Sequence, residues 1–444
     1  MIRDHAVHSR ETGLSDYGKE MFMAIRFRFA AAALAAALSS AAWAAPGCDL
    51  ALINESTAAE IFSACTEAAE AGDTSAELNL AYIYAIGKKY RDAAKWFRRA
   101  ADHGSADAEY LLGTLYLEGK GVTKSQGEAV RWLRKAAEQG HSGAEFSLGT
   151  LYAGGLGVGK SPAEAVRWYR KAAEQGNAEA LNNLGQAYCE GSGVPQNFSE
   201  CAKWLRKSAE RGNDAAMFNL GLMYENGRGV PQNYREAAGW HRKAADHGNM
   251  HAEFNLAGLY MNGRGVPVDF YEAKRLYQMA AEKGYAPAYF NLGVMHQYGR
   301  PGIQASLPVA VKYYRKAAEL GYPQAMVNLG NMYENGHGVT RNYNEAVRWY
   351  RKAADQGFPL AESNLGSMYQ RGLGVARNCN EAVRWFRKAA EQGSPEGQYN
   401  LGLMYRQGLG VQKNEREAEK WIGLARAQGY APAQMSVGGL QGRN

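Results

Sequence analysis

The sequence has few of the residues and motifs that mark catalytic or metal-binding sites. Only five of its 444 residues are cysteines, and nine are histidines. The patterns S-x-x-K, H-E-x-x-H and G-x-S-x-G do not occur, which argues against serine β-lactamase, zinc protease and α/β-hydrolase chemistry. His241, His247 and His251 form one imidazole cluster, but we expect His247 in a turn that gives a metal no fixed geometry. The sequence therefore predicts no enzyme, no cofactor and no metal site.

Long apolar runs are also lacking, apart from one near the N-terminus. There Arg26 and Arg28 precede an Ala- and Leu-rich run from Phe29 to Leu38, and Ala42-Trp43-Ala44 follows. Basic, apolar and A-x-A segments in this order are typical of a secretory signal peptide, and the run is too short for a permanent membrane anchor. We predict export with cleavage after Ala44, and hence a periplasmic or secreted protein without a transmembrane segment.

Neither sign of charge dominates the chain. The sequence has 51 Lys and Arg against 44 Asp and Glu, a formal net charge of +7. The basic residues are spread along the chain and not gathered in one block, so nucleic acid is not an expected partner. An apolar fraction of 46% with 27 tyrosines supplies enough side chains for packed helices and argues against disorder.

All five cysteines follow the predicted cleavage point, where an oxidising compartment permits disulfides. Cys48 with Cys65 and Cys189 with Cys201 are the plausible pairs. For Cys189 and Cys201 the alternative is that both are small buried apolar residues. Cys379 has no partner in this scheme.

One unit recurs along almost the whole chain. From Leu112 on, a leucine marks each unit, is followed by Gly in all copies except the one with Ala257, and recurs every 36 residues except for one step of 37. The marked leucines after the first copy, at Leu80, are Leu112, Leu148, Leu184, Leu220, Leu256, Leu292, Leu329, Leu365 and Leu401. A period of this length is typical of stacked modules, each of which contacts mainly its neighbours.

The first part of a unit predicts a helix that ends in a glycine-rich turn. In the copy at residues 144–176, Ala144, Leu148 and Tyr152 lie on one helical face. Gly155-Leu156-Gly157-Val158 follows, and two glycines suit the left-handed backbone that ends a helix and reverses the chain.

The second part of a unit predicts an antiparallel partner helix. Ser161 and Glu164 flank Pro162 as a capping box at its start, and Gly176 ends it. The same box recurs in most copies and is missing after Ser306, where Val309 replaces the glutamate. The repeats also set the expected boundaries: residues 1–44 as N-terminal extension and signal peptide, 45–75 as a half-repeat cap, 76–432 as the repeat array, and 433–444 as a C-terminal half-repeat and tail.

The pattern A-x3-LG-x2-Y-x2-G-x-GV, followed by EA-x2-WY-x2-AA-x2-G, resembles the Sel-one-like repeat, a relative of the tetratricopeptide repeat. The resemblance covers about residues 74–440 and implies an all-α, right-handed superhelical solenoid of about ten antiparallel helix hairpins. The first helices of the hairpins are then expected to line its concave side. Family members resemble adaptors that assemble protein complexes, and exported bacterial members serve in envelope regulation, exopolysaccharide export and host interaction. Cysteine-rich relatives have been linked to β-lactam binding or hydrolysis, but this chain lacks their regular cysteine pair in each repeat.

An asparagine precedes the marked leucine in most copies, and the resemblance implies that it faces the groove. Related tetratricopeptide domains use such asparagines to hold peptide backbone or a C-terminal carboxylate. An amide suits this role because it both donates and accepts hydrogen bonds. We therefore predict a groove that binds a protein or peptide. The alternative is a structural ladder in which each asparagine bonds the neighbouring repeat. The predicted groove residues are Asn183, Asn219, Asn255, Asn291, Asn328, Asn364 and Asn400, together with Asn331 one turn further on.

The second helices carry a basic strip, of which Arg167, Arg170 and Lys171 are one copy. It is interpreted either as a solvated face with local ion pairs or as a surface that attracts acidic glycans or lipids. The predicted function is a non-catalytic scaffold or adaptor in the cell envelope that binds envelope or host proteins. The alternative is a protein that binds glycan or cell wall, or a weak hydrolase.

Overall fold

The computed structural model describes residue 48, residue 50 and residues 58–435. The predicted signal peptide, its cleavage point and most of the C-terminal tail lie outside these residues. Within them the chain forms 22 α-helices and no β-strand, apart from one isolated bridge between Arg300 and Ile303. No helix in this part of the chain is both long and apolar enough to cross a membrane.

The chain divides into two compact units, and the boundary falls within α11 (Asp214–Asn226). Residues up to Ala216 and Arg228–Val230 belong to the first unit, and Met217–Gly227 and the residues after Val230 belong to the second. The helices of the first unit are α2 (Ala58–Glu70), α3 (Thr74–Ile86), α4 (Tyr90–Asp102), α5 (Ala106–Glu118), α6 (Gln126–Glu138), α7 (Ser142–Gly154), α8 (Pro162–Glu174), α9 (Ala178–Glu190) and α10 (Phe198–Ala209). Those of the second are α12 (Tyr234–Asp246), α13 (Met250–Asn262), α14 (Phe270–Glu282), α15 (Ala286–Tyr298), α16 (Leu307–Glu319), α17 (Pro323–Asn335), α18 (Tyr343–Ala354), α19 (Pro359–Arg371), α20 (Cys379–Glu391), α21 (Pro395–Gln407), α22 (Glu415–Ala427) and α23 (Ala431–Met435).

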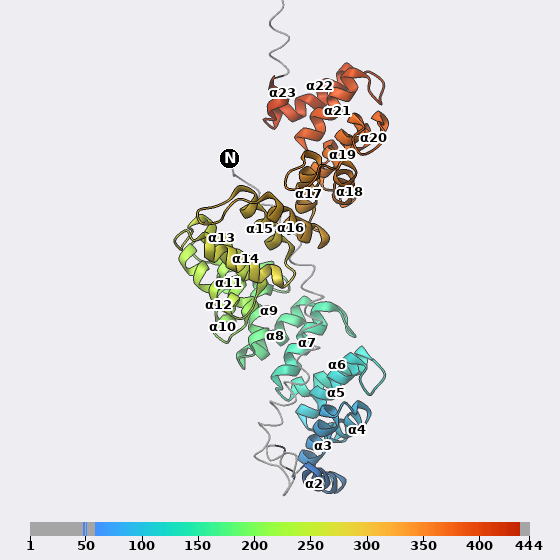
Figure 1. The fold of residues 1–444 in the computed structure, drawn as a ribbon. Coiled ribbons are helices and arrows are strands. Elements are labelled where there is room, and N and C mark those ends of the chain that lie inside the picture. Colours follow the sequence, from blue (N-terminus) through green and yellow to red (C-terminus); the bar gives the residue numbers. More distant parts are fainter. Residues whose placement is uncertain (1–47, 49, 51–57, 436–444) are drawn as a thin grey trace, which may run out of the picture. The chain divides into compact units, whose positions relative to one another are not determined.

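Consecutive helices pair as hairpins from α3/α4 to α21/α22, with α2 and α23 outside the pairs (Figure 1). This confirms the predicted all-α repeat of helix hairpins. In each hairpin the marked leucine is at the centre of the core; Leu148 and Leu329, for example, are fully buried. Gly149 lets the two helices approach, because a Cβ at this position would lie 2.7 Å from the ring of Tyr169.

The glycine-rich turn has a structural task beyond reversing the chain. Gly155 and Gly157 have φ values of +70° and +72°, which only glycine adopts freely. A Cβ on Gly157 would lie 2.6 Å from the backbone oxygen of Gln126, at the start of α6. The turn of one hairpin therefore packs directly on the second helix of the hairpin before it.

Only half of each predicted capping box forms. The Ser161 side chain accepts a hydrogen bond from the backbone N–H of Glu164 at 3.3 Å. The backbone N–H of Ser161 does not bond the Glu164 carboxylate, because it donates to the backbone oxygen of Tyr152 at 2.9 Å. Ser306 makes no such bond at the start of α16, where Val309 replaces the glutamate. The turn before α16 is also irregular: it contains the Arg300–Ile303 bridge, and Tyr271 donates its hydroxyl to the backbone oxygen of Gly302 at 2.7 Å.

Candidate functional site

The predicted groove asparagines lie on the first helices, neither fully buried nor fully exposed. All seven residues that precede a marked leucine, from Asn183 to Asn400, are half-buried, and Asn331 is exposed. The equivalent Asn79 is buried and donates to the backbone oxygen of Cys48 at 3.0 Å. The column is therefore reachable from solvent in seven copies, and each side chain also has neighbours in the core.

Three of these asparagines bond a tyrosine of the preceding second helix. Hydrogen bonding by the amides of Asn183, Asn291 and Asn328 lowers the pKa of Tyr169, Tyr277 and Tyr314, against the larger effect of burial. The Tyr314 hydroxyl itself donates to Gln297 Oε1 at 2.5 Å. Burial raises the pKa of Tyr277 to about 12, and its bond to Asn291 opposes that shift. In these copies the amide links one hairpin to the next, as expected for the structural ladder.

In three of the other copies the residue fourteen positions before the asparagine is not a tyrosine, and in the fourth, before Asn364, it is Tyr350, whose hydroxyl donates to Glu334 at 2.9 Å. Phe386 takes that place before Asn400, and a phenyl ring offers no hydrogen bond. His241 takes it before Asn255, and its Nε2 lies 3.4 Å from Glu225 Oε2. No hydrogen bond to Asn255 or Asn400 occurs among the described residues. Their amides are therefore not committed to the core.

A polar group near Asn331 was not predicted from the sequence. Glu334 of α17 accepts the hydroxyl of Tyr350 at 2.9 Å and pairs with Arg371 of α19 at 3.1 Å. Asn335 donates to the backbone oxygen of Asn331 at 3.0 Å. Burial and the adjacent Glu334 carboxylate raise the pKa of Tyr350. The faces of α17 and α19 thus combine amide, carboxylate and guanidinium groups.

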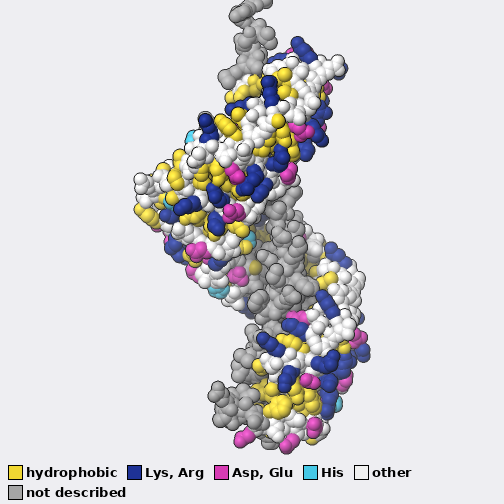
Figure 2. Space-filling view, turned by 45° about the vertical axis from the view of Figure 1, so that its right-hand side comes forward, with side chains coloured by type: hydrophobic (Ala, Val, Ile, Leu, Met, Phe, Trp, Pro, Cys, Tyr) yellow, Lys and Arg dark blue, Asp and Glu magenta, His cyan; other side chains and the backbone are white. Residues whose placement is uncertain are grey.

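The basic strip is partly committed to local contacts. Arg167 pairs with Glu164 at 3.3 Å, Lys171 lies 4.5 Å from the ring centre of Trp168, and Arg170 donates to the phenol of Tyr188 at 2.9 Å. Figure 2 shows Lys and Arg side chains with acidic ones among them over both units. The Arg–Tyr contact links consecutive hairpins and recurs as Arg98–Tyr116, Arg134–Tyr152, Arg242–Tyr260, Arg315–Tyr333, Arg351–Tyr369 and Arg387–Tyr405.

A set of buried glutamates was not predicted from the sequence. Glu145, 3% exposed in the first turn of α7, accepts from Gln175 at the end of α8 at 2.8 Å. Glu109–Gln139 and Glu362–Gln392 repeat this contact at 2.7 and 2.8 Å. Burial raises the pKa of all three carboxyls. The signal was present in the sequence, since Glu directly follows the alanine of the pattern in five copies.

The cysteines and histidines have structural surroundings. Disulfides join Cys48 to Cys65 and Cys189 to Cys201, with S–S distances of 2.03 and 2.09 Å, and Cys379 is a free thiol. His247 caps the end of α12, whereas His241 is fully buried in the core. No group of three or more metal-ligating side chains suited to an ion occurs in the described part of the chain.

One motif escaped the sequence analysis. Residues 154–161 read GGLGVGKS, which fits the G-x-x-x-x-G-K-S pattern of phosphate-binding loops. In that class of site a β-strand precedes the loop, but here the helix α7 precedes it. Gly155 and Gly157 serve the turn between hairpins, and Ser161 caps α8. The match therefore comes from the repeat turn and does not form a nucleotide site.

Stacked helix hairpins with reachable first helices define the class of helical-repeat proteins that generally act as protein–protein interaction scaffolds. The Sel1 repeat family model matches ten segments: residues 74–105, 106–141, 142–177, 178–213, 214–249, 251–285, 286–322, 323–358, 359–394 and 395–430. The chain belongs to the Sel1 repeat family. No curated protein sequence matches it.

Two solved structures support the same assignment. A protective antigen with an SLR fold, present in uropathogenic Escherichia coli strains, is 39% identical, with a TM-score of 0.72 over 85% of this chain and 82% of that one. A Sel1 repeat protein from Oxalobacter formigenes is 35% identical, with a TM-score of 0.58 over 70% of this chain and 90% of that one. Solenoids of this family are generally non-catalytic.

Proposed function

We propose that this protein is an envelope scaffold that binds a protein or peptide segment across the exposed faces of its first helices. The observation that carries the proposal is the half-buried asparagine column beside residues that vary from copy to copy and are half-buried or exposed. The column supplies the same amide in seven copies, while the residues that follow it include Leu222, Val294, Asn331 and Leu403. A fixed hydrogen-bonding frame beside variable side chains is how one repeat scaffold selects one partner.

The asparagines divide into two kinds under this proposal. Asn255 and Asn400 are the ones we expect to contact a partner, because no core group holds their amides. Asn328 bonds Tyr314, so its main role is to join hairpins. Asn331 and the Glu334–Arg371 pair extend the binding face on α17 and α19.

An extracytoplasmic location is supported by two observations, one on this chain and one on a relative. Cys48–Cys65 and Cys189–Cys201 are bonded, and such bonds persist in oxidising compartments and are rare in the cytosol. The E. coli relative is described as a protective antigen, which fits a protein accessible outside the cytoplasm. Fractionation with N-terminal sequencing of the mature protein tests this location and the predicted cleavage after Ala44.

The binding proposal is tested by cross-linking in cells followed by mass spectrometry. We expect one or a few defined proteins to cross-link to the wild type and to be lost from an Asn255→Ala/Asn400→Ala variant. That variant should keep its thermal stability, because neither amide is bonded to the core. Unchanged cross-links in a folded variant would rule out the asparagine column as the binding face.

A further inference from the structure

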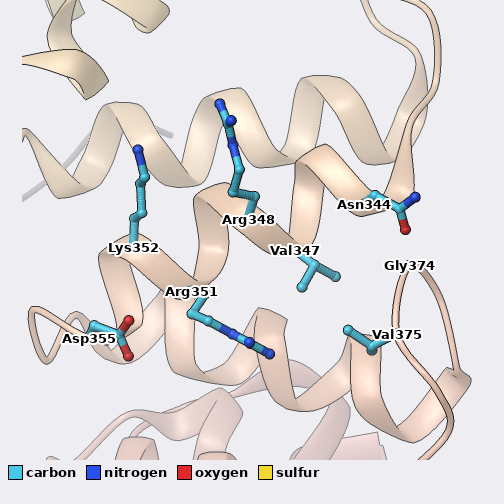
Figure 3. Close-up of a pocket in the computed structure, with 8 residues that line it drawn as sticks. All are labelled: Asn344, Val347, Arg348, Arg351, Lys352, Asp355, Gly374 and Val375. Carbon is cyan, nitrogen blue, oxygen red and sulfur yellow. The ribbon is translucent and has the colours of Figure 1, made fainter.

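Charge is divided between the two helices of a hairpin. The second helices are basic, but their cations are used within the fold, as the hollow on α18 shows (Figure 3). Of the side chains that line it, Arg348 pairs with Glu345 at 3.3 Å, and Lys352 lies 4.5 Å from the ring centre of Trp349. The second-helix face therefore has few cations left for a ligand.

The first helices have almost no positive charge. No lysine occurs in α3, α5, α7, α9, α11, α13, α15, α17, α19 or α21, and their arginines are Arg371 and Arg406 alone. Arg371 pairs with Glu334 and Arg406 with Glu415, each at 3.1 Å. An acidic ligand on these helices would therefore find no lysine and only two arginines that already have carboxylate partners.

The last residues of four consecutive first helices occupy equivalent positions in the second unit. They are Asn226 of α11, Asn262 of α13, Tyr298 of α15 and Asn335 of α17, and all four are exposed. Stacked repeats place equivalent positions in a row. We call these four residues the C-terminal row.

The asparagines of the C-terminal row present hydrogen-bond acceptors. Each donates its side-chain N–H to the backbone oxygen four residues earlier, at 2.8 Å for Asn226 and Asn262 and at 3.0 Å for Asn335. No hydrogen bond to their Oδ1 atoms occurs among the described residues, so these oxygens are open to a ligand. The carbonyl ends of the helices add partial negative charge. Glu225, next to Asn226, adds a carboxylate whose Oε2 lies 3.4 Å from Nε2 of His241.

Tyr298 supplies an aromatic ring within the C-terminal row. It is 68% exposed, more than any other large hydrophobic side chain of the described residues. His296, in the same last turn, stacks on Tyr313, and burial lowers its pKa, so this imidazole is neutral near pH 7. The face of a tyrosine ring attracts cations, and no cationic side chain of α15 competes for it.

We propose that the C-terminal row binds a lysine- or arginine-rich segment of the partner protein, with one cationic side chain over the ring of Tyr298. Lysine and arginine only donate hydrogen bonds, which matches a row of acceptors. A sugar would also require donors for its hydroxyl oxygens, and α11, α13, α15 and α17 contain no lysine or arginine to supply them. The inference rests on the proposed function, because it names the chemistry of the partner that the first helices hold.

The test is fluorescence anisotropy of the full-length mature protein with a labelled peptide of repeating Lys-Gly-Arg at low ionic strength. The chain has a formal net charge of +7, so net charge alone would repel this peptide. We expect saturable binding that weakens as salt is added, and no binding of a repeating Gln-Gly-Gln peptide. Tyr298→Leu should raise Kd about fourfold, because leucine has no aromatic face, whereas Tyr298→Phe should leave Kd nearly unchanged.

Asn262→Asp gives a second test that does not depend on weakening the site. The new carboxylate cannot donate to the helix carbonyl, so it does not stabilise the fold, but its charge should lower Kd about threefold. Gly239→Asp on α12 is the matched control. It adds the same charge to a second helix, where a Cβ has no neighbour within 4 Å, and should leave Kd unchanged.

Three results would overturn the inference: no binding of the basic peptide, an unchanged Kd in Tyr298→Leu, or equal gains in affinity from Asn262→Asp and Gly239→Asp. These results are distinguishable from failure of the proposed function. If the basic peptide does not bind but partner cross-links in cells are still lost from Asn255→Ala/Asn400→Ala, the cationic partner is ruled out and the proposed function stands.

Discussion

The two units use the same helix hairpin but reinforce it differently. The first unit has two disulfides, Cys48–Cys65 and Cys189–Cys201, whereas the described residues of the second contain none and leave Cys379 as a free thiol. The second unit instead has the irregular turn at residues 299–303 and the polar Glu334–Tyr350–Arg371 group. The comparison teaches that the repeat itself holds each hairpin together, while additions to single copies decide local stability and surface chemistry.

The largest expected effect comes from removing the covalent reinforcement of the first unit. Cys189→Ala/Cys201→Ala should lower the unfolding free energy of that unit by about 3 kcal/mol, because the bond constrains a short loop in the unfolded chain. Hydrogen exchange should report faster opening of α9 and α10 and no change in α17 to α20. Cys379→Ala is the matched control and should change neither region; equal protection in both variants would mean that the bond does not stabilise the unit.

The next effect separates two asparagines at the same repeat position. Asn328→Ala removes a hydrogen bond to the buried Tyr314 and should cost about 1 kcal/mol. At the same repeat position Asn400 follows Phe386 in place of a tyrosine and has no such bond to lose. Asn400→Ala should therefore change the unfolding free energy by less than about 0.5 kcal/mol. Chemical denaturation of the two variants side by side checks this. Equal losses would show that the tyrosine contact is not what distinguishes them.

A smaller effect is expected from the glutamate in the first turn of a second helix. Glu164→Val removes this carboxylate and its pair with Arg167 in the first unit, and Val309→Glu supplies one at the same place in the second. Each should shift the unfolding free energy by about 0.5–1 kcal/mol, downward for the first change and upward for the second. Thermal unfolding followed by circular dichroism measures both. Two shifts of the same sign would rule out the first-turn glutamate as the explanation.

The smallest expected effect concerns the buried glutamates and depends on pH. Burial raises the pKa of Glu145 in the folded protein, so the ionised carboxylate destabilises the fold at neutral pH. Glu145→Gln should therefore raise stability slightly at pH 7. This gain should shrink as the pH falls through the raised pKa of Glu145, where the wild-type carboxyl takes up its proton. Urea unfolding of wild type and variant at several pH values measures the difference.

Another copy of the repeat already has a glutamine at the position of Glu145. At the equivalent place Gln428 donates to Gln398 at 2.9 Å, so an amide fits this position. A loss of stability at pH 7 in Glu145→Gln would contradict the role given to burial.

The sequence predicted the helices, caps and turns well because each is a local feature repeated many times. Ser161 with Glu164 predicts the start of a helix, and Gly155 with Gly157 predicts the turn before it, each from residues only a few positions apart. The partners of the asparagines were harder to predict. Asn328 and Asn400 occupy the same repeat position but differ in the residue fourteen places earlier, Tyr314 or Phe386. Asn364 also follows a tyrosine at that distance, Tyr350, but the Tyr350 hydroxyl donates to Glu334. The burial of Glu145 was missed because its partner Gln175 is on the other helix of the hairpin.

The most direct test of the central claim, that exposed first helices hold a protein partner, is site-specific photo-cross-linking in cells. One photoreactive residue replaces the exposed Asn331 on α17, and another replaces Gly239 on α12, a second-helix position where a Cβ has no neighbour within 4 Å. We predict a defined protein adduct from position 331 and none from position 239. The same adducts from both positions, or none from position 331, would contradict it.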